Sequence, residues 1–518
     1  MQARRTILRD GLIIDGTGAP SFMGDVVVEN GRIASVDRSD DRRGNWSSTD
    51  SDVVDCSGNV IAPGFIDAHS HSDLQVLQNR TEKLLQGVTA EVVGNCGFST
   101  YPASSDPHVL RSFANGILCG DDKWHWGTAS EYLADAKLSQ VATVASLVGH
   151  GALRINAAGE TSRELTPKEI ERMCGLLEES LEQGATGFSS GLMYAPGSGA
   201  SAAELKALAN VAACKGAVYA THMRSYSAGL LEAVDEQLDI ARDSGCRLQI
   251  SHLQAAGEDF WPKQQRAIAA IEKAHGDGVD VSFDAYPWLA GSTVLTQVLP
   301  QWALDGGSDQ LLARLSDPSE RDRIRPHIQP EARWNGVVIT SAAKSEHLLV
   351  GRSIEQISGE RGITPEDAVM DILIEQEGHV NVVEHCQSRE NLHGLLTHPL
   401  ATVVTDGVYT RGRSHPRLYA TFPLLLGELV RERKWMSLEE AIHKVTHKPA
   451  TTFHIADRGR LAPGCIADIT VFNPDAIRTE ATYEVPDVAP IGISSVWRNG
   501  KRLVNDGVVS LFTATCES

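Results

Sequence analysis

The sequence lacks any run approaching the roughly 20 successive apolar residues that a membrane-spanning helix needs. It also lacks an export signal, because Arg9 and Asp10 interrupt the first apolar stretch and no small-residue cleavage site follows. Hydrophobic residues make up 42% of the chain and charged residues 22%, which is typical of globular proteins. We therefore expect a cytoplasmic protein with no membrane partner.

Positive charge is also scarce. The net charge is −20, and the acidic residues are spread along the chain rather than gathered in a tail. Because nucleic-acid binding requires a basic surface that neutralises phosphates, we expect no nucleic-acid partner. A homo-oligomer is compatible with the sequence, which does not determine the oligomeric state.

Cysteine pairs of the C-x-x-C type are absent. The nine cysteines are widely spaced and odd in number, and without an export signal this pattern indicates reduced thiols. Most of them are expected to be buried as small apolar residues. Cys96 is the exception, because of the residues that surround it in the predicted fold.

Both ends of the chain are rich in short strand-like segments. "GDVVVENGRIASVD" near the start and "GISSVWRNGKRLVNDGVVS" near the end contain Asn-Gly or Asp-Gly turns that favour antiparallel hairpins. At 518 residues the chain is long for one core. We predict a small β-sandwich built from residues 1–60 and 446–518, with one large domain, residues 61–445, inserted between them.

The middle of the chain alternates short apolar runs with helical patterns such as "TPKEIERMCGLLEESLEQG". About eight strands that alternate with helices predict an α/β fold with a parallel sheet. The near-continuous apolar character of the strands favours closure into a (β/α)8 TIM-like barrel. The stretch at about 289–350 interrupts this rhythm and is interpreted as an insertion over one strand end, where it can serve as a lid.

Polar residues end most of the predicted barrel strands, and this is the end where barrel enzymes carry their chemistry. They are His69, His71, Cys96, His150, His222, His252, Asp284, Tyr286 and Asp406. Each histidine alone is more commonly a hydrogen-bonded core or rim residue. Their joint occurrence at separate strand ends favours a metal site, and imidazole, thiolate and carboxylate together suit zinc.

Several motifs resemble those of a known family. "PGFIDAHSHSD", "THMR", "ISHL", "TDG" and the closing "THKPATTFHIADRGRLAPGCIADITVFNP" are similar to the amidohydrolase superfamily. "EVVGNCGFS", "GFSSGLMYAPG", "FDAYPW" and "HPRLYATFP" resemble its D-aminoacylase (N-acyl-D-amino-acid deacylase) branch. The motifs occur in the right order over nearly the whole chain. A cysteine that ends the second strand is unusual among these barrels and supports this branch.

The resemblance implies a metal site and a reaction. It implies one tightly bound Zn²⁺ held by Cys96, His222 and His252, and a second, weaker site that shares Cys96 with His69 and His71. Such a zinc ion lowers the pKa of water to about 7.

The resemblance also implies roles for the remaining site residues. Asp406 would be the general base and acid in the hydrolysis of a linear amide. His150, Tyr194 and Tyr286 are candidates for stabilising the oxyanion or the substrate, with packing or a rim position as the alternative for each.

The sequence differs from the D-aminoacylase branch at residues expected to contact the substrate rather than at those expected to bind the metal. Gln254 stands where the branch has a lysine that pairs with the substrate carboxylate. Arg417, in "HPR", is retained and can hold a carboxylate with two hydrogen bonds. The substrate is therefore expected to be an N-acyl-D-amino acid or a related small N-acyl compound.

Two alternatives follow from the same residues. A cyclic amide or imide hydrolase, or a deaminase, can use the same metal core. A non-catalytic binding protein of this fold would be expected to have lost metal ligands, and all the expected ligand types are present.

Overall fold

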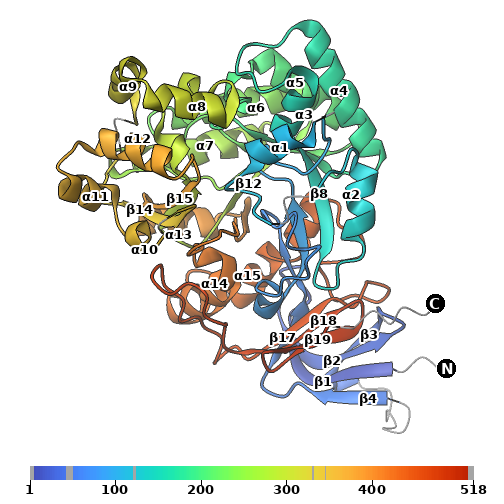
Figure 1. Cartoon of the computed structure of the whole chain (residues 1–518). Helices are drawn as coiled ribbons and strands as arrows, with labels where there is room; N and C mark the ends of the chain where they lie inside the picture. Colours follow the sequence, from blue (N-terminus) through green and yellow to red (C-terminus); the bar gives the residue numbers. More distant parts are fainter. Residues whose placement is uncertain are drawn as a thin grey trace, which may run out of the picture.

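The computed structural model describes residues 5–41, 51–104, 106–120, 124–329, 332–344 and 346–511. The chain folds into a barrel of parallel strands surrounded by helices, with a mixed sheet below it and a helical unit at one side (Figure 1). Blue and red strands lie side by side in the lower sheet, so both ends of the chain contribute to it.

Eight parallel strands form the barrel. They are hydrogen-bonded to one another in chain order: β6 (Phe65–Asp67), β7 (Val88–Val93), β8 (Thr143–Gly149), β9 (Gly187–Gly191), β10 (Val218–His222), β11 (Arg247–Ile250), β12 (Val281–Ala285) and β16 (Ala401–Val403). A parallel bridge between Ser70 and Gly407 connects the segments that follow β6 and β16. The barrel is therefore nearly closed, which confirms the predicted fold class.

Side chains alternate between two cores along the barrel strands. In β10, Val218 and Ala220 belong to a small cluster with Val92, while Tyr219 packs in the large cluster that contains Phe188. Both faces of these strands are therefore buried, as their near-continuous apolar sequences predict.

Helices follow the strands and pack around them (Figure 1). In the first half of the barrel they are α1 (Pro107–Ala114), α2 (Ala129–Ala136), α3 (His150–Ala158), α4 (Pro167–Glu182), α5 (Ala202–Cys214), α6 (Leu230–Ser244) and α7 (Lys263–Gly276). After the inserted unit they are α13 (Arg389–Thr397), α14 (Arg417–Leu424), α15 (Leu438–Lys444) and α16 (His447–Thr452). The Thr166 side chain accepts a hydrogen bond from the Glu169 backbone and Pro167 opens α4, so this helix begins where its sequence predicts.

The mixed sheet is built from both ends of the chain. Its strands are β1 (Arg5–Ile13), β2 (Phe22–Glu29), β3 (Arg32–Arg38), β4 (Ser51–Asp55), β5 (Val60–Pro63), β17 (Ile469–Phe472), β18 (Ile493–Arg498), β19 (Lys501–Asn505) and β20 (Val508–Val509). Antiparallel pairing of β5 with β17 joins the two ends. This sheet has a core of its own, which includes Leu8, Ile61 and Trp497.

A third sheet lies in the unit between β12 and β16, at the left of Figure 1. Its antiparallel strands are β13 (Ala290–Val294), β14 (Val337–Ala342) and β15 (Val380–His385), with β15 in the centre. Five helices accompany them: α8 (Gly307–Ser316), α9 (Pro318–Ile324), α10 (Glu346–Leu349), α11 (Ile354–Arg361) and α12 (Pro365–Glu375). Ile339 and Leu373 pack in a separate core of this unit. The domain boundaries stay predictions.

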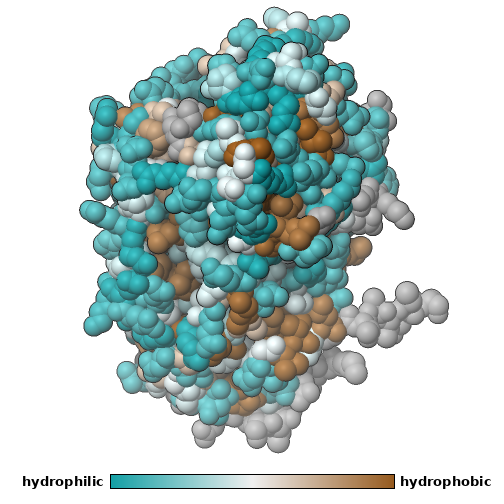
Figure 2. Space-filling view, turned by 60° about the vertical axis from the view of Figure 1, so that its left-hand side comes forward, coloured by the Kyte–Doolittle hydropathy of each residue, from teal (hydrophilic) through white to brown (hydrophobic). Residues whose placement is uncertain are grey.

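The surface in Figure 2 is mostly hydrophilic, with small, separate hydrophobic areas. None of the helices in the described ranges combines the length and apolar composition that crossing a membrane requires.

Candidate metal centre

Six candidate residues come together at the C-terminal ends of the barrel strands. His69 and His71 follow β6, Cys96 follows β7 and His222 ends β10, while His252 and Asp406 follow β11 and β16. All six are buried, with 0–8% of their surface exposed. They line one cavity, apart from the fully buried His69.

The potential ligand atoms form three overlapping groups in which all the atoms lie within 4.8 Å of one another. The groups are Cys96 with His222 and His252, Cys96 with His69 and His71, and His69 with His252 and Asp406. The Cys96 sulfur lies 3.4 Å from Nε2 of His252 and 3.3 Å from Nε2 of His69. The thiol therefore stands between the two predicted metal positions.

Three of these residues have a backbone conformation that side chains normally avoid. The φ angles of Cys96, His252 and Asp406 are 54°, 35° and 48°. A left-handed conformation costs a non-glycine residue about 1–3 kcal/mol, and such residues gather at functional sites. Hydrogen bonds hold two of them: the His252 N–H donates to Asp284 at 2.6 Å, and the Asp406 N–H donates to the His69 carbonyl at 2.9 Å.

Asp406 is held as a carboxylate. Burial would raise its pKa, but Arg417, His69 and a hydrogen bond from His71 outweigh this effect and hold the pKa well below its usual range. Nη1 of Arg417 lies 2.9 Å from Oδ2 of Asp406, and Nε2 of His71 lies 3.3 Å from Oδ1. The carboxylate is therefore shared between the histidine cluster and the guanidinium.

A buried ion network supports the segment that carries His69 and His71. The Lys83 ammonium donates to Asp67 at 2.7 Å, to Glu91 at 2.9 Å and to the Ser70 hydroxyl at 2.8 Å. Asp67 also accepts two hydrogen bonds from Thr405, through its N–H at 2.9 Å and its hydroxyl at 2.6 Å. This network connects β6, β7 and the segment before Asp406.

This network was not predicted from the sequence. Asp67 precedes His69 by two residues, and in an extended segment this spacing places both side chains on one side. The strand pattern therefore indicates that Asp67 lies near the site. Lys83 and Glu91 have no spacing that connects them with Asp67, and only the fold brings them together.

Most of the predicted substrate residues line the same cavity. The Arg417 guanidinium stacks 4.7 Å above the Tyr286 ring, and its buried Nε has no hydrogen-bond partner. The Tyr286 hydroxyl donates to Gln254 at 3.2 Å. The Tyr194 ring lies 4.8 Å from the His222 ring, measured between centroids.

His150 is placed differently. It is fully buried, its Nε2 lies 2.7 Å from Glu204, and Arg154 pairs with the same carboxylate. It is not among the residues that line the cavity. This position favours packing, the alternative that the sequence leaves open for His150.

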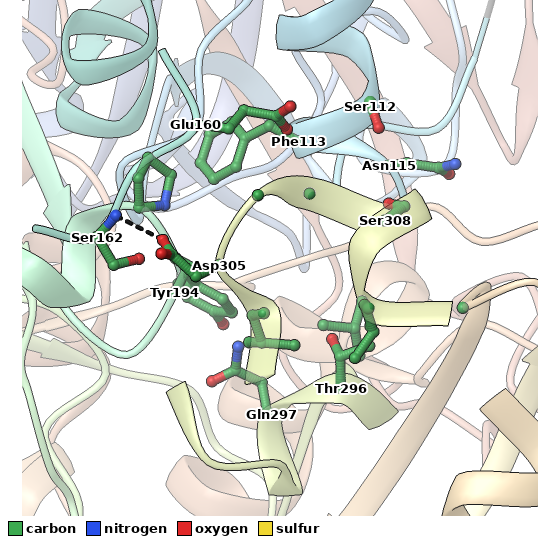
Figure 3. A pocket seen from close by; sticks show the side chains of 18 of the residues that line it. Ser112, Phe113, Asn115, Glu160, Ser162, Tyr194, Thr296, Gln297, Asp305 and Ser308 are labelled. Atoms are coloured by element: carbon green, nitrogen blue, oxygen red, sulfur yellow. Dashed lines mark hydrogen bonds between the residues drawn. The ribbon is translucent and has the colours of Figure 1, made fainter. Parts of the chain in front are cut away.

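A second cavity, drawn in Figure 3, adjoins the first. The linings of the two cavities share Ile117, Tyr194 and Gln297. The polar side chains of the second cavity include Glu160 and Asp305, and the Ser162 N–H donates to Asp305 at 2.8 Å. The two cavities thus meet at Tyr194, whose ring lies beside His222.

Replacement of Lys83 by methionine is expected to lower the free energy of unfolding by about 3–5 kcal/mol, because Asp67 and Glu91 would then be buried without a counter-charge. Urea unfolding measures the change. Lys206→Met is the control, since Lys206 forms an exposed ion pair with Asp243 and its loss should cost about 1 kcal/mol or less. Equal losses in the two variants would contradict the structural role of Lys83.

Comparison with known proteins gives consistent matches. The model of the "Amidohydrolase family" matches residues 52–504. An N-acyl-D-glutamate deacylase of Alcaligenes xylosoxydans xylosoxydans is 34% identical over 497 residues, which cover 95% of this chain and 92% of that protein.

Solved structures agree with these matches. The zinc- and phosphonate-bound N-acyl-D-glutamate deacylase of Bordetella bronchiseptica has a TM-score of 0.83 at 31% identity, covering 97% of each chain. A D-aminoacylase described as having a binuclear metal centre, with one-metal activation and second-metal attenuation, also has a TM-score of 0.83 at 31% identity. That match covers 98% of this chain and 97% of the other.

Proposed function

The chain belongs to the amidohydrolase family, and on that premise we propose that it hydrolyses the amide bond of N-acyl-D-amino acids. It is a D-aminoacylase-like, metal-dependent hydrolase of carbon–nitrogen bonds, so the resemblance of its motifs is confirmed. The observation that carries the proposal is that one cavity is lined by Arg417 together with Cys96, His222, His252 and Asp406. The relatives are named for hydrolysis of N-acyl-D-amino acids, which supports the same substrate class.

The donor set fits zinc. A tetrahedral zinc ion separates its ligand atoms by about 3.3–3.8 Å. The Cys96 sulfur lies 3.4 Å from Nε2 of His252, within this range, and Nδ1 of His222 lies slightly closer to the same nitrogen, at 3.0 Å. Burial lowers the pKa of His222 to about 3, so its imidazole is neutral and able to coordinate. We assign the tightly bound ion to Cys96, His222 and His252.

Cys96 is suited to a shared position. Burial raises the pKa of its thiol, and His69 only partly opposes this effect, so a thiolate here depends on a bound cation. His69 and His71 lie on the other side of the sulfur and would hold the weaker, second ion. The relative with the binuclear centre supports two positions.

When bound, zinc lowers the pKa of water and polarises a carbonyl group. Asp406 is the proton carrier: its carboxylate accepts the proton of the attacking water and returns it to the departing nitrogen. A carboxylate with a strongly lowered pKa is a weak base. Because Arg417 is a main cause of this low pKa, a substrate that shares Arg417 would raise the pKa of Asp406 towards the range that base catalysis needs.

Arg417 is the residue that would bind the substrate carboxylate. Its Nε is buried without a hydrogen-bond partner, and Nη1 contacts Asp406. Among the described residues that line the cavity, Arg417 is the only lysine or arginine. Gln254 supplies a neutral amide where the branch has a lysine, and Tyr286 keeps both Gln254 and Arg417 in place.

A substrate panel tests the function. Zinc-loaded enzyme is expected to hydrolyse N-acetyl-D-methionine, and to act much more slowly on its L-enantiomer, on hydantoin and on an aminopurine. The reactions are measured by release of the free amino acid from the N-acyl compounds, by formation of N-carbamoylglycine from hydantoin and by release of ammonia from the aminopurine. Turnover of the cyclic compound or the aminopurine without any N-acyl amino acid would contradict the proposal.

Replacement of Cys96 by alanine is expected to remove the tightly bound zinc and the activity together, because the site loses its only anionic ligand. Metal analysis of the purified protein measures zinc per chain. Cys214→Ala is the matched control, since Cys214 is an exposed thiol on α5. Full zinc content in Cys96→Ala would exclude Cys96 as a ligand.

Replacement of Asp406 by asparagine is expected to lower kcat by about 10²–10⁴-fold, the usual effect of losing a general base, while the zinc content stays unchanged. The control is Asp243→Asn, at an exposed carboxylate that pairs with Lys206. A kcat within a few-fold of wild type would show that another group moves the proton.

A further inference from the structure

A second carboxylate faces the cavity and has no part in the proposed mechanism. Glu384 lies in β15, the central strand of the inserted sheet. Val382, Glu384 and Cys386 alternate along the chain, and all three line the cavity, as period-two alternation predicts for one face of a strand. Gly291 and Val337, which are paired with Glu384 in the flanking strands, line the cavity as well.

The Glu384 carboxylate has an apolar setting and no partner of its own. Val337 and Val382 border it on the strands, and Val298 belongs to the same lining. No hydrogen bond or ion pair joins its carboxylate to the described part of the chain. Burial raises the pKa of Glu384, and no neighbouring charge opposes the effect. A carboxylate left in this state favours a cationic ligand.

The location of Glu384 relative to Arg417 indicates which part of the substrate it meets. Burial raises the pKa of the Cys386 thiol, the charge of Glu384 adds to this effect, and Arg417 opposes it. Nη2 of Arg417 also donates to the Ser292 carbonyl at 3.4 Å, and Ser292 follows Gly291, the residue paired with Glu384, so Arg417 and Glu384 lie on the same side of the cavity. If Arg417 holds the α-carboxylate, the group nearest Glu384 is the amino-acid side chain rather than the acyl group.

We propose that Glu384 is a specificity-determining residue, which selects N-acyl-D-amino acids that have a cationic side chain of the lysine or arginine type. This inference rests on the proposed function and specifies its substrate class. An ammonium or guanidinium would supply the partner that Glu384 lacks. An acidic side chain, as in the substrate named for the N-acyl-D-glutamate deacylases, would bring two like charges together in an apolar setting and be rejected.

The test compares three substrates that share the acetyl group and differ in the side chain: N-acetyl-D-lysine (free ε-amino group), N-acetyl-D-norleucine, which has a neutral side chain, and N-acetyl-D-glutamate. Wild-type kcat/KM is expected to be highest for the lysine compound. In Glu384→Gln the ratio of lysine to norleucine is expected to fall by about tenfold or more, the effect of losing one charge-assisted contact. Activity on the glutamate compound should rise.

Glu355→Gln is the matched control, because Glu355 is exposed on α11 outside the cavity, and its substrate ratios should equal those of wild type. Zinc content and melting temperature show that each variant is folded and loaded. Two outcomes would overturn the role of Glu384 and leave the deacylase function intact. In one, the wild-type enzyme hydrolyses N-acetyl-D-norleucine with no preference for the lysine compound; in the other, a preference for the lysine compound persists in Glu384→Gln. If the wild-type enzyme hydrolyses none of the three, the proposed function itself fails.

Discussion

Closure of the barrel between β6 and β16 is the constraint on which the candidate site depends. The backbone of Asp406 donates to the His69 carbonyl, and the His71 backbone donates to the Gly407 carbonyl at 3.1 Å. Asp67 receives two further hydrogen bonds from Thr405. Asp67 and Thr405 are 338 residues apart in the chain, so closure of the barrel brings the Asp406 carboxylate to the histidine pair.

The same closure concentrates charge that the fold must balance. Lys83 neutralises carboxylates beneath the site, and Arg417 pairs with Asp406 within it. Burial lowers the pKa of His222 and of His252 and raises the pKa of the Cys96 thiol, so these three buried donors are uncharged in the protein itself. Buried donor atoms in this state are costly unless they coordinate a cation, so the metal ion is part of the electrostatic balance of the site.

The inserted sheet forms one wall of the cavity. The barrel strands carry the residues that are proposed to hold metal and move protons, whereas β13 and β15 supply the wall that faces the substrate. Glu384, on β15, belongs to this wall and was not among the residues predicted from the sequence, whereas the predicted Gln254 follows β11 in the barrel. The proposed metal ligands and the proposed specificity residue therefore lie on different parts of the fold.

The sequence by itself determined the class of fold and the metal-binding chemistry. Strand periodicity, helix caps and polar strand ends are local signals, and they placed Cys96, His222 and His252 correctly at the strand ends. The tertiary structure alone decided which distant groups meet. Closure of the barrel and the inserted unit decide four features. They are the Lys83 network, the pairing of Arg417 with Asp406, the contact of His150 with Glu204 and the position of Glu384 in the cavity lining. The partners are separated by intervening loops, by 8 residues for Lys83 and Glu91 and by 54 for His150 and Glu204. Such contacts leave no periodic pattern in the sequence, and for that reason they could not be predicted from it.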